Sequence, residues 1–412
     1  MWLNCQKFVR GVVRGAWITG PRVRVGTKLL LIEQIALIIF FIAGSHGLIV
    51  ELTAPTTTDY VSFYAAGSLA ADGTPGLAYD RAAHYAAEQR ATEPGIPYQF
   101  FFYPPVFLLV CAVFSKLPYL VSFIVFQLVT LAGFLLVMRA ILRDTYRGWL
   151  VAVLGFSAVF WTIGLGQNGF LTVALLGGGL WLLDRRPFAA GLLFGALCYK
   201  PHFGLLIPLV LLVSQRWTAI LGAAVSLLGL CLLSVAAFGL DVWGQYLDAV
   251  LFSRGVYEAG QIDFAGYVTP FGAAMLVGLP VWLAHGVQIV VSLSVAAVVA
   301  WIWRRGASLP VRAAALAAGT LLVVPLALLY DLLLLLLAMA WLVRAGRTGG
   351  FLPGEKFIFV CAYLVPLALR SVANLALIPL GPLATGAVLV LCVMRTRKEL
   401  RDGFGAAATE RL

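Results

Sequence analysis

The sequence predicts an all-α, polytopic integral membrane protein. Hydrophobic residues make up 62% of its 412 residues and charged residues only 11%, whereas a soluble globular chain carries about 25% charged residues. The apolar runs continue for about 15 to 25 residues, which is the length of a membrane-spanning helix and not of an alternating barrel strand. The low charged fraction excludes a soluble enzyme. The six cysteines show no metal-ligand spacing, and we expect no disulfide scaffold.

The net charge of +11 does not indicate a nucleic-acid partner, because the basic residues are confined to the N-terminus and to short loops. Residues 1–28 contain six basic residues and no acidic one, which predicts a basic, cytoplasmic N-terminal segment. The apolar run at residues 29–50 predicts the first membrane span.

Residues 51–103 form a long polar stretch with six acidic and two basic residues. An acidic loop after a basic N-terminus belongs on the external side of the membrane. Two short helices are expected in this loop, at residues 61–71 and 80–92, separated by the turn-forming residues 72–76.

Residues 29–394 are expected to form a single transmembrane domain of about 11–13 membrane segments, several of them too short to span alone. A second acidic loop at residues 239–267 is placed outside, and residues 395–412 form a cytoplasmic tail. The basic cluster at residues 139–147 conflicts with two full spans at 104–138, which would put it outside. Either one of these two segments is re-entrant, or the positive-inside rule fails locally.

Polar side chains at membrane depth are candidates for function by default. Lys200 and His202 flank Pro201, which breaks the surrounding helix, and the break predicts either a cationic pocket for a phosphate or an ordinary external loop. Gln167 and Asn168 lie between two glycines, in either a simple turn or a polar cap on the same cavity. The remaining candidates in apolar surroundings are Tyr330, Asp331 and Arg370.

Asp59 follows the first predicted span and precedes the first helix of the external loop. An aspartate in this position is commonly a helix N-cap. The alternative is a general base at the membrane surface.

Four motifs in this order resemble glycosyltransferase family 87, the polyprenol-phosphate-mannose-dependent mannosyltransferases of the C-type glycosyltransferase fold. The residues that carry the resemblance are Asp59-Tyr60 with Phe63-Tyr64-Ala65-Ala66-Gly67, then Tyr103-Pro104-Pro105, then Gly166-Gln167-Asn168, and then Lys200-Pro201. The pattern covers residues 45–215 well and the C-terminal half weakly. Tyr330-Asp331 stands where some members carry adjacent histidines, which leaves the acceptor and the transferred sugar open.

The resemblance implies that Asp59 is the catalytic base of an inverting hexosyltransferase of the cell envelope. Its partners would be a polyprenyl-phosphate sugar donor, a glycan or glycolipid acceptor and membrane lipids. Lys200, His202 and Arg370 would bind the donor phosphate, and no metal or other cofactor is needed. The cavity is expected to be lined by Tyr60, Tyr64, Tyr103, Gln167, Asn168, Tyr330 and Asp331.

The implied location is the bacterial inner membrane, with a cytoplasmic N-terminus and an active site facing the external, periplasmic side. The second acidic loop either shapes the acceptor cleft or is solvated and structureless. The competing hypothesis is a membrane transporter or lipid flippase, in which the buried charges would bind a substrate or couple it to protons.

Overall fold

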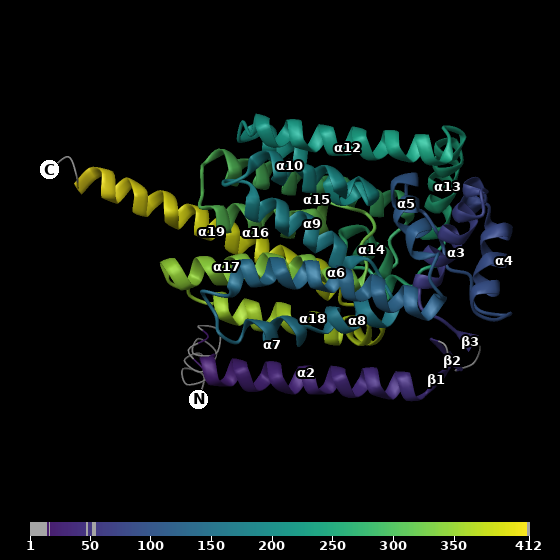
Figure 1. Cartoon of the computed structure of the whole chain (residues 1–412). Helices are drawn as coiled ribbons and strands as arrows, with labels where there is room; N and C mark the ends of the chain where they lie inside the picture. Colours follow the sequence, from purple (N-terminus) through teal and green to yellow (C-terminus); the bar gives the residue numbers. More distant parts are fainter. Residues whose placement is uncertain (1–14, 16, 47, 52–54, 410–412) are drawn as a thin grey trace.

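The computed structural model describes residues 15, 17–46, 48–51 and 55–409, and they form an elongated bundle of helices (Figure 1). Seven of the described helices are long and apolar enough to cross a membrane, which confirms the all-α, polytopic fold class. These helices are α2 Gly20–Ala43, α6 Tyr119–Leu142, α12 Trp217–Phe238, α15 Val281–Arg304, α17 Leu333–Gly349, α18 Glu355–Ala376 and α19 Leu380–Thr409. A short 3₁₀ helix, η5 Leu329–Leu332, leads directly into α17.

Shorter helices fill the spaces between the long ones. They are α5 Pro105–Phe114, α7 Trp149–Leu154, α8 Ser157–Leu165, α9 Gly169–Leu182, α10 Pro187–Ala196, α11 Leu206–Val213, α14 Pro270–Leu276 and α16 Leu309–Val323, with the 3₁₀ helices η2 Leu197–Tyr199 and η3 Pro201–Gly204. A ten-residue helix rises about 15 Å, half of a hydrocarbon core of about 30 Å. Five shorter apolar segments join the seven long helices, and together they fall within the predicted 11–13 membrane segments.

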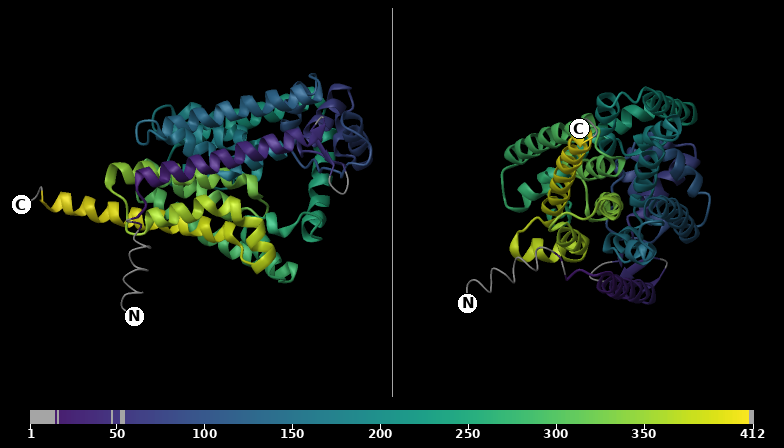
Figure 2. Two further views of the ribbon diagram at one scale, coloured as in Figure 1. Left: turned by 90° about the horizontal axis from the view of Figure 1, so that it is seen from below. Right: turned by 90° about the vertical axis from the view of Figure 1, so that its left-hand side faces the viewer.

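The polar loops gather at one end of the bundle, and both described chain ends lie toward the other (Figures 1 and 2). The first polar loop contains α3 Tyr60–Ala71, η1 Pro75–Tyr79 and α4 Arg81–Ala91, which confirms its two predicted helices. The second contains α13 Asp241–Glu258 and η4 Phe264–Gly266, so its structureless alternative is wrong. We call this the loop end, and the opposite one the basic end.

The first span differs from its predicted bounds of 29–50. Helix α2 begins at Gly20, with Pro21 in its first turn, and ends at Ala43, where the Gly44 N–H donates to the Phe40 carbonyl at 3.0 Å. The chain then turns into a small antiparallel sheet of β1 Ser45–His46, β2 Ile49–Glu51 and β3 Pro55–Thr56. Proline is favoured in a helical first turn, so the helix extends back through basic residues that the sequence placed before it.

Helix α5 settles the conflict over the basic cluster at residues 139–147. With ten residues it is too short to span, whereas α6 has 24 residues and runs back toward the basic end (Figure 1). Tyr146, just after α6, lies 5.9 Å from the Arg347 guanidinium, ring centroid to Cζ, and interacts electrostatically with Arg24 of α2. The cluster therefore lies at the same end as the start of α2. This agrees with the alternative in which one of the two segments, here α5, is re-entrant.

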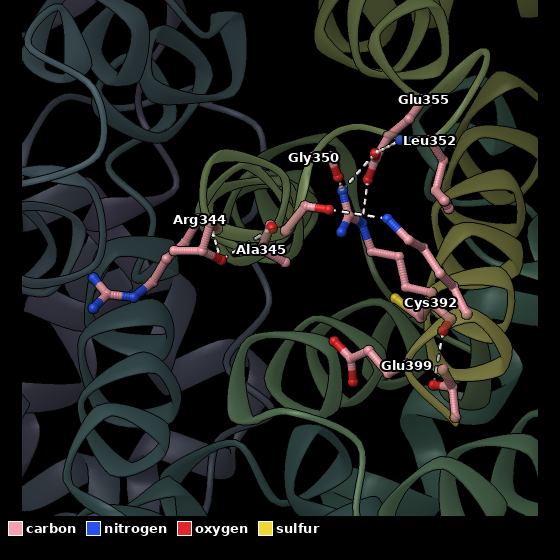
Figure 3. Close-up of polar contacts among 12 residues, drawn as sticks. Arg344, Ala345, Gly350, Leu352, Glu355, Cys392 and Glu399 are labelled. Atoms are coloured by element: carbon pink, nitrogen blue, oxygen red, sulfur yellow. Dashed lines mark hydrogen bonds and ion pairs between the residues drawn. The ribbon is translucent and has the colours of Figure 1, made fainter. Parts of the chain in front are cut away.

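A buried ion pair joins α18 and α19 at the basic end (Figure 3). The Arg395 guanidinium donates from Nε and Nη2 to the two Glu355 carboxylate oxygens, at 2.5 and 2.6 Å. Glu355 Oε2 also accepts the Leu352 N–H at 2.8 Å, and Arg395 Nη2 also donates to the Gly350 carbonyl at 3.2 Å. The pair thus ties both helices to the connection between α17 and α18.

Candidate active site

Asp59 stands at the N-terminus of α3, but its side chain does not cap that helix. Asp59 Oδ2 instead accepts a hydrogen bond from Gln167 Nε2 at 2.8 Å, across 108 residues of chain. Asp80 shows the ordinary arrangement, because its Oδ1 accepts the Ala83 N–H at 2.8 Å and caps α4. The capping interpretation of Asp59 is therefore wrong.

The surroundings of Asp59 alter its acidity. Desolvation of the carboxyl by neighbouring protein raises the pKa of Asp59 to about 6, and the Gln167 N–H partly offsets this effect. A carboxyl with such a pKa is ionised at neutral pH and can still accept a proton readily.

The turn between α8 and α9 places Gln167 and Asn168. Gly166 adopts a left-handed conformation with φ of 69°, which disfavours any residue with a side chain. A Cβ at this position would also lie only 2.6 Å from Tyr60 Cβ, so both the backbone conformation and the close packing require glycine. Gln127 of α6 braces the turn from the other side, since its Nε2 donates to the Gln167 carbonyl at 3.2 Å.

Lys200 lies in the break between η2 and η3, and its side chain is 6% exposed. Its ammonium donates to Asp331 Oδ1 at 2.9 Å and to Asn168 Oδ1 at 3.3 Å. Asp331 Oδ2 accepts the Leu328 N–H at 3.0 Å, so both carboxylate oxygens are occupied. This burial rules out the external-loop interpretation of Lys200.

Aromatic rings complete the surroundings of the ammonium. Lys200 Nζ lies 4.8 Å from the Phe203 ring centroid and 5.3 Å from that of Tyr330. Both rings can attract the cation through their negative faces.

Two consecutive amides connect the carboxylate and the ammonium. Gln167 donates to Asp59, and the next residue, Asn168, accepts from Lys200. These partners fix the orientation of both amides, because a carboxylate needs a donor and an ammonium an acceptor. Among the described residues, Gln167 Oε1 and Asn168 Nδ2 are buried without a hydrogen bond of ordinary distance and angle, although the Asn168 side chain also interacts with Tyr103.

Unpaired polar atoms in a protein interior are costly. Here an unpaired acceptor lies on the side chain bound to Asp59, and an unpaired donor lies on the one bound to Lys200. A ligand with a hydroxyl at one position and an anionic oxygen at the other would satisfy both.

The predicted cavity tyrosines have different positions. Tyr103 is influenced by both halves of the site: burial holds its pKa well above the usual range, a hydrogen-bonding interaction with the Asn168 side chain acts against this, and the charges of Asp331 and Asp59 add to the rise. The Tyr60 hydroxyl lies 2.6 Å from Ser122 Oγ, and the Tyr64 hydroxyl donates to the Leu117 carbonyl at 3.0 Å. Tyr60 and Tyr64 therefore anchor α3 through their hydroxyls.

His202 and Arg370 are less closely connected to this cluster. The half-buried His202 ring packs against Phe203 with centroids 4.4 Å apart. Arg370 Nη2 donates to Asp263 Oδ2 at 2.8 Å, and about half of each side chain is exposed. The structure thus pairs Arg370 with the second polar loop, and among the described residues it makes no hydrogen bond or ion pair with Lys200.

Sequence reasoning missed a buried pair in the first polar loop. His84 and Glu88 are fully buried on α4, with His84 Nδ1 and Glu88 Oε1 3.7 Å apart. Desolvation raises the pKa of Glu88 to about 8 and lowers that of His84 to about 4, so both are uncharged at neutral pH. Their spacing of four residues on one helix face was the available signal.

This pair supports the helix that begins at Asp59. His84 Nε2 lies 3.0 Å from the Ser62 carbonyl of α3, and both Glu88 oxygens accept the Gln99 N–H. The contacts hold α3 against α4 and against the strand-like segment that leads to Tyr103.

Comparison with known proteins identifies the family of the chain. No curated protein and no solved structure is significantly similar to it. The family model for glycosyltransferase family 87 matches residues 101–328, more than half of the chain. The matched region contains Tyr103, Gln167, Asn168 and Lys200, whereas Asp59 and Asp331 lie outside it. The chain therefore belongs to glycosyltransferase family 87.

Proposed function

We propose that this membrane glycosyltransferase moves a hexose, mannose in the first instance, from a polyprenyl-phosphate donor to a hydroxyl of a glycan or glycolipid acceptor. The observation that carries the proposal is the pair of adjacent amides at Gln167 and Asn168. Through them a carboxylate and a buried ammonium, 141 residues apart in sequence, belong to one polar cluster. A base and a cation in one site are what displacement of a phosphate by a hydroxyl requires.

Asp59 acts on the acceptor side of the reaction. Its carboxylate takes the proton of the acceptor hydroxyl while that oxygen bonds to the anomeric carbon, and Gln167 Oε1 is free to orient the same hydroxyl. Desolvation favours the protonated form of Asp59, and the hydrogen bond from the Gln167 N–H favours the ionised form that can act as a base.

Lys200 acts on the leaving-group side. As the anomeric carbon–oxygen bond breaks, polyprenyl phosphate keeps the bonding electrons and gains negative charge. One N–H of the ammonium is not used by Asp331 or Asn168, and Asn168 Nδ2 is a second available donor. Single-step displacement inverts the configuration at the anomeric carbon.

Family membership favours this activity over the transporter or flippase hypothesis. The two are separated by an assay without a membrane compartment. Purified protein in detergent, given polyprenyl-phosphate mannose and an extracted glycolipid acceptor fraction, should release polyprenyl phosphate and mannosylated product. Donor that stays intact in detergent but crosses the bilayer of reconstituted vesicles would contradict the proposal.

We further propose that the loop end faces the external side of the membrane. The support is the segregation of charge: basic clusters lie at the end where α2 begins, and acidic loops lie at the other. Single cysteines at Ala82 of α4 and at Asp144 after α6, both exposed, test it in intact spheroplasts. A membrane-impermeant maleimide should label position 82 and spare position 144, and the reverse labelling would invert the topology.

A further inference from the structure

A groove of about 550 Å³ opens at the loop end, between the first polar loop and α13. Its volume lies in the range of small-molecule and cofactor sites, about 300–1,000 Å³. The mechanism above uses none of its lining residues, and no comparison assigns it a role.

The groove is lined by aromatic rings, most of them partly exposed. The rings belong to Tyr79, Tyr98, Phe100, Phe102 and Phe252. Phe252 of α13 is 51% exposed, so its ring is accessible to a ligand in the groove. The faces of sugar rings carry weakly positive C–H groups, which pack well on the negative face of an aromatic ring.

Polar side chains stand among these rings. Both hydrogen-bond donors and acceptors are present, on Asp80, Arg81, Gln245 and Asp248. The side chains of Gln245 and Asp248 are exposed and form no hydrogen bond with the rest of the described chain. A sugar hydroxyl both donates and accepts, so it suits such a mixture.

Gly76 lets the groove take this form. A Cβ at Gly76 would lie only 2.2 Å from Gln245 Oε1. The absence of a side chain there allows the Gln245 amide of α13 to reach across to the first polar loop.

The groove adjoins the candidate active site. The hydroxyl of Tyr79, which lines the groove, donates to the Tyr103 carbonyl at 2.9 Å. Tyr103 in turn interacts electrostatically with Asp59 and Asp331. Tyr103 therefore links the groove to the reacting groups, through one hydrogen bond on the groove side and through longer-range electrostatics on the other.

We infer that this groove is a saccharide subsite, which binds sugar units of a neutral oligosaccharide acceptor beyond the unit that receives the new sugar. Two carboxylates and one guanidinium give the groove no net positive charge, which disfavours an anionic glycan. The inference rests on the proposed function, and it defines the acceptor as a chain of several sugars held by rings on one side and by Asp248 and Gln245 on the other.

Direct binding of soluble sugars tests the inference without catalysis. Purified full-length protein is placed in nanodiscs of phosphatidylethanolamine and phosphatidylglycerol, which contain no sugar headgroups. The probes are neutral trisaccharides of mannose, glucose and galactose, the corresponding monosaccharides, and a trisaccharide with a uronic acid, all followed by saturation-transfer NMR and calorimetry. At least one neutral trisaccharide should bind about tenfold more tightly than its monosaccharide.

Matched substitutions on α13 locate the binding. Phe252→Ala should weaken trisaccharide binding about tenfold or more, as expected for a buried aromatic contact in the complex, and Asp248→Asn should weaken it less. Leu251→Ala and Asp241→Asn, at exposed positions of the same helix outside the groove, should leave it unchanged. The inference is overturned if no neutral trisaccharide binds, if Phe252→Ala binds like the wild type, or if the uronic acid probe binds best.

The outcome can be separated from that of the proposed function. Asp59→Asn protein should bind the trisaccharide normally while losing transfer, whereas Phe252→Ala should raise KM for the acceptor and leave KM for the donor unchanged. If the wild type released no polyprenyl phosphate in detergent, the proposed function would fail and the sugar-binding result would still stand.

Discussion

Two buried ion pairs among the described residues lie at opposite ends of the bundle and differ in geometry. At the basic end, Arg395 and Glu355 form two parallel hydrogen bonds and also bind the Gly350 carbonyl and the Leu352 N–H. At the loop end, Lys200 makes a single contact of 2.9 Å with Asp331 and a longer one with Asn168.

We propose that this difference separates a structural pair from a functional one. The planar guanidinium of Arg395 matches both oxygens of its carboxylate in fixed geometry, which locks the pair in one arrangement. The Lys200 ammonium makes one hydrogen bond to its carboxylate, and its flexible stem allows the third N–H to turn toward a ligand. We therefore expect changes at the loop end to act on turnover and changes at the basic end to act on stability.

The largest effect on turnover is expected for Asp59→Asn, which removes the proposed base and keeps the shape. General-base catalysis contributes about 10²–10⁴-fold, so turnover should fall by that factor while thermal unfolding is unchanged. Asp72→Asn, at the exposed far end of the same helix, is the matched control. Turnover within a few fold of the wild type would leave Asp59 without a catalytic role.

The next effect is expected when the Lys200 pair is neutralised. Removing one member of a buried pair costs about 3–5 kcal/mol of stability, so Lys200→Met and Asp331→Asn should be combined. Asparagine at 331 retains an acceptor for the Leu328 N–H. The double variant should fold and yet lose about 10–150-fold in donor affinity, since a hydrogen bond to a charged group contributes about 1.5–3 kcal/mol.

A smaller effect is expected on the pH dependence of kcat/KM. With the pKa of Asp59 at about 6, activity should rise with pH through that value, because the base must be ionised to accept a proton. Gln167→Leu removes the hydrogen bond that lowers this pKa, so the rising limb should move to higher pH. A limb that stayed in place would show that another group titrates.

The smallest effect on turnover is expected at the basic end. Arg395→Met combined with Glu355→Gln removes one positive and one negative charge, as the Lys200→Met/Asp331→Asn variant does, and the site is equally buried. Thermal unfolding is expected to shift, while kcat and KM per folded molecule should remain at wild-type values. Loss of donor affinity in this variant would erase the distinction between the two pairs.

Periodicity and charge predicted more of the fold than of the site. Hydropathy identified the helical membrane domain, and the acidic loops and basic clusters fell at opposite ends as expected. The start of α2 was predicted nine residues too late, because hydropathy marks the apolar core of a helix and not its polar first turns. The role of α5 stayed open, since the sequence could not show that residues 115–118 turn the chain back.

Motifs predicted the candidate site residues, but not their partners. Asp59 and Gln167, or Lys200 and Asp331, meet only through tertiary packing, and no local pattern specifies contacts across 108 or 131 residues. For the same reason we expected Arg370 to bind the donor phosphate together with Lys200, whereas the fold pairs Arg370 with Asp263 on another loop. The burial of His84 and Glu88 was likewise hidden by the polar composition of their loop.

Donor binding tests the division of the site most directly. Affinity for polyprenyl-phosphate mannose should be measured at equilibrium, without acceptor, for the wild type, for Asp59→Asn and for Lys200→Met/Asp331→Asn. We expect near wild-type affinity for Asp59→Asn and a loss of about 10–150-fold for the double variant. Wild-type affinity in the double variant, or a comparable loss in Asp59→Asn alone, would show that Lys200 does not bind the donor phosphate separately from Asp59.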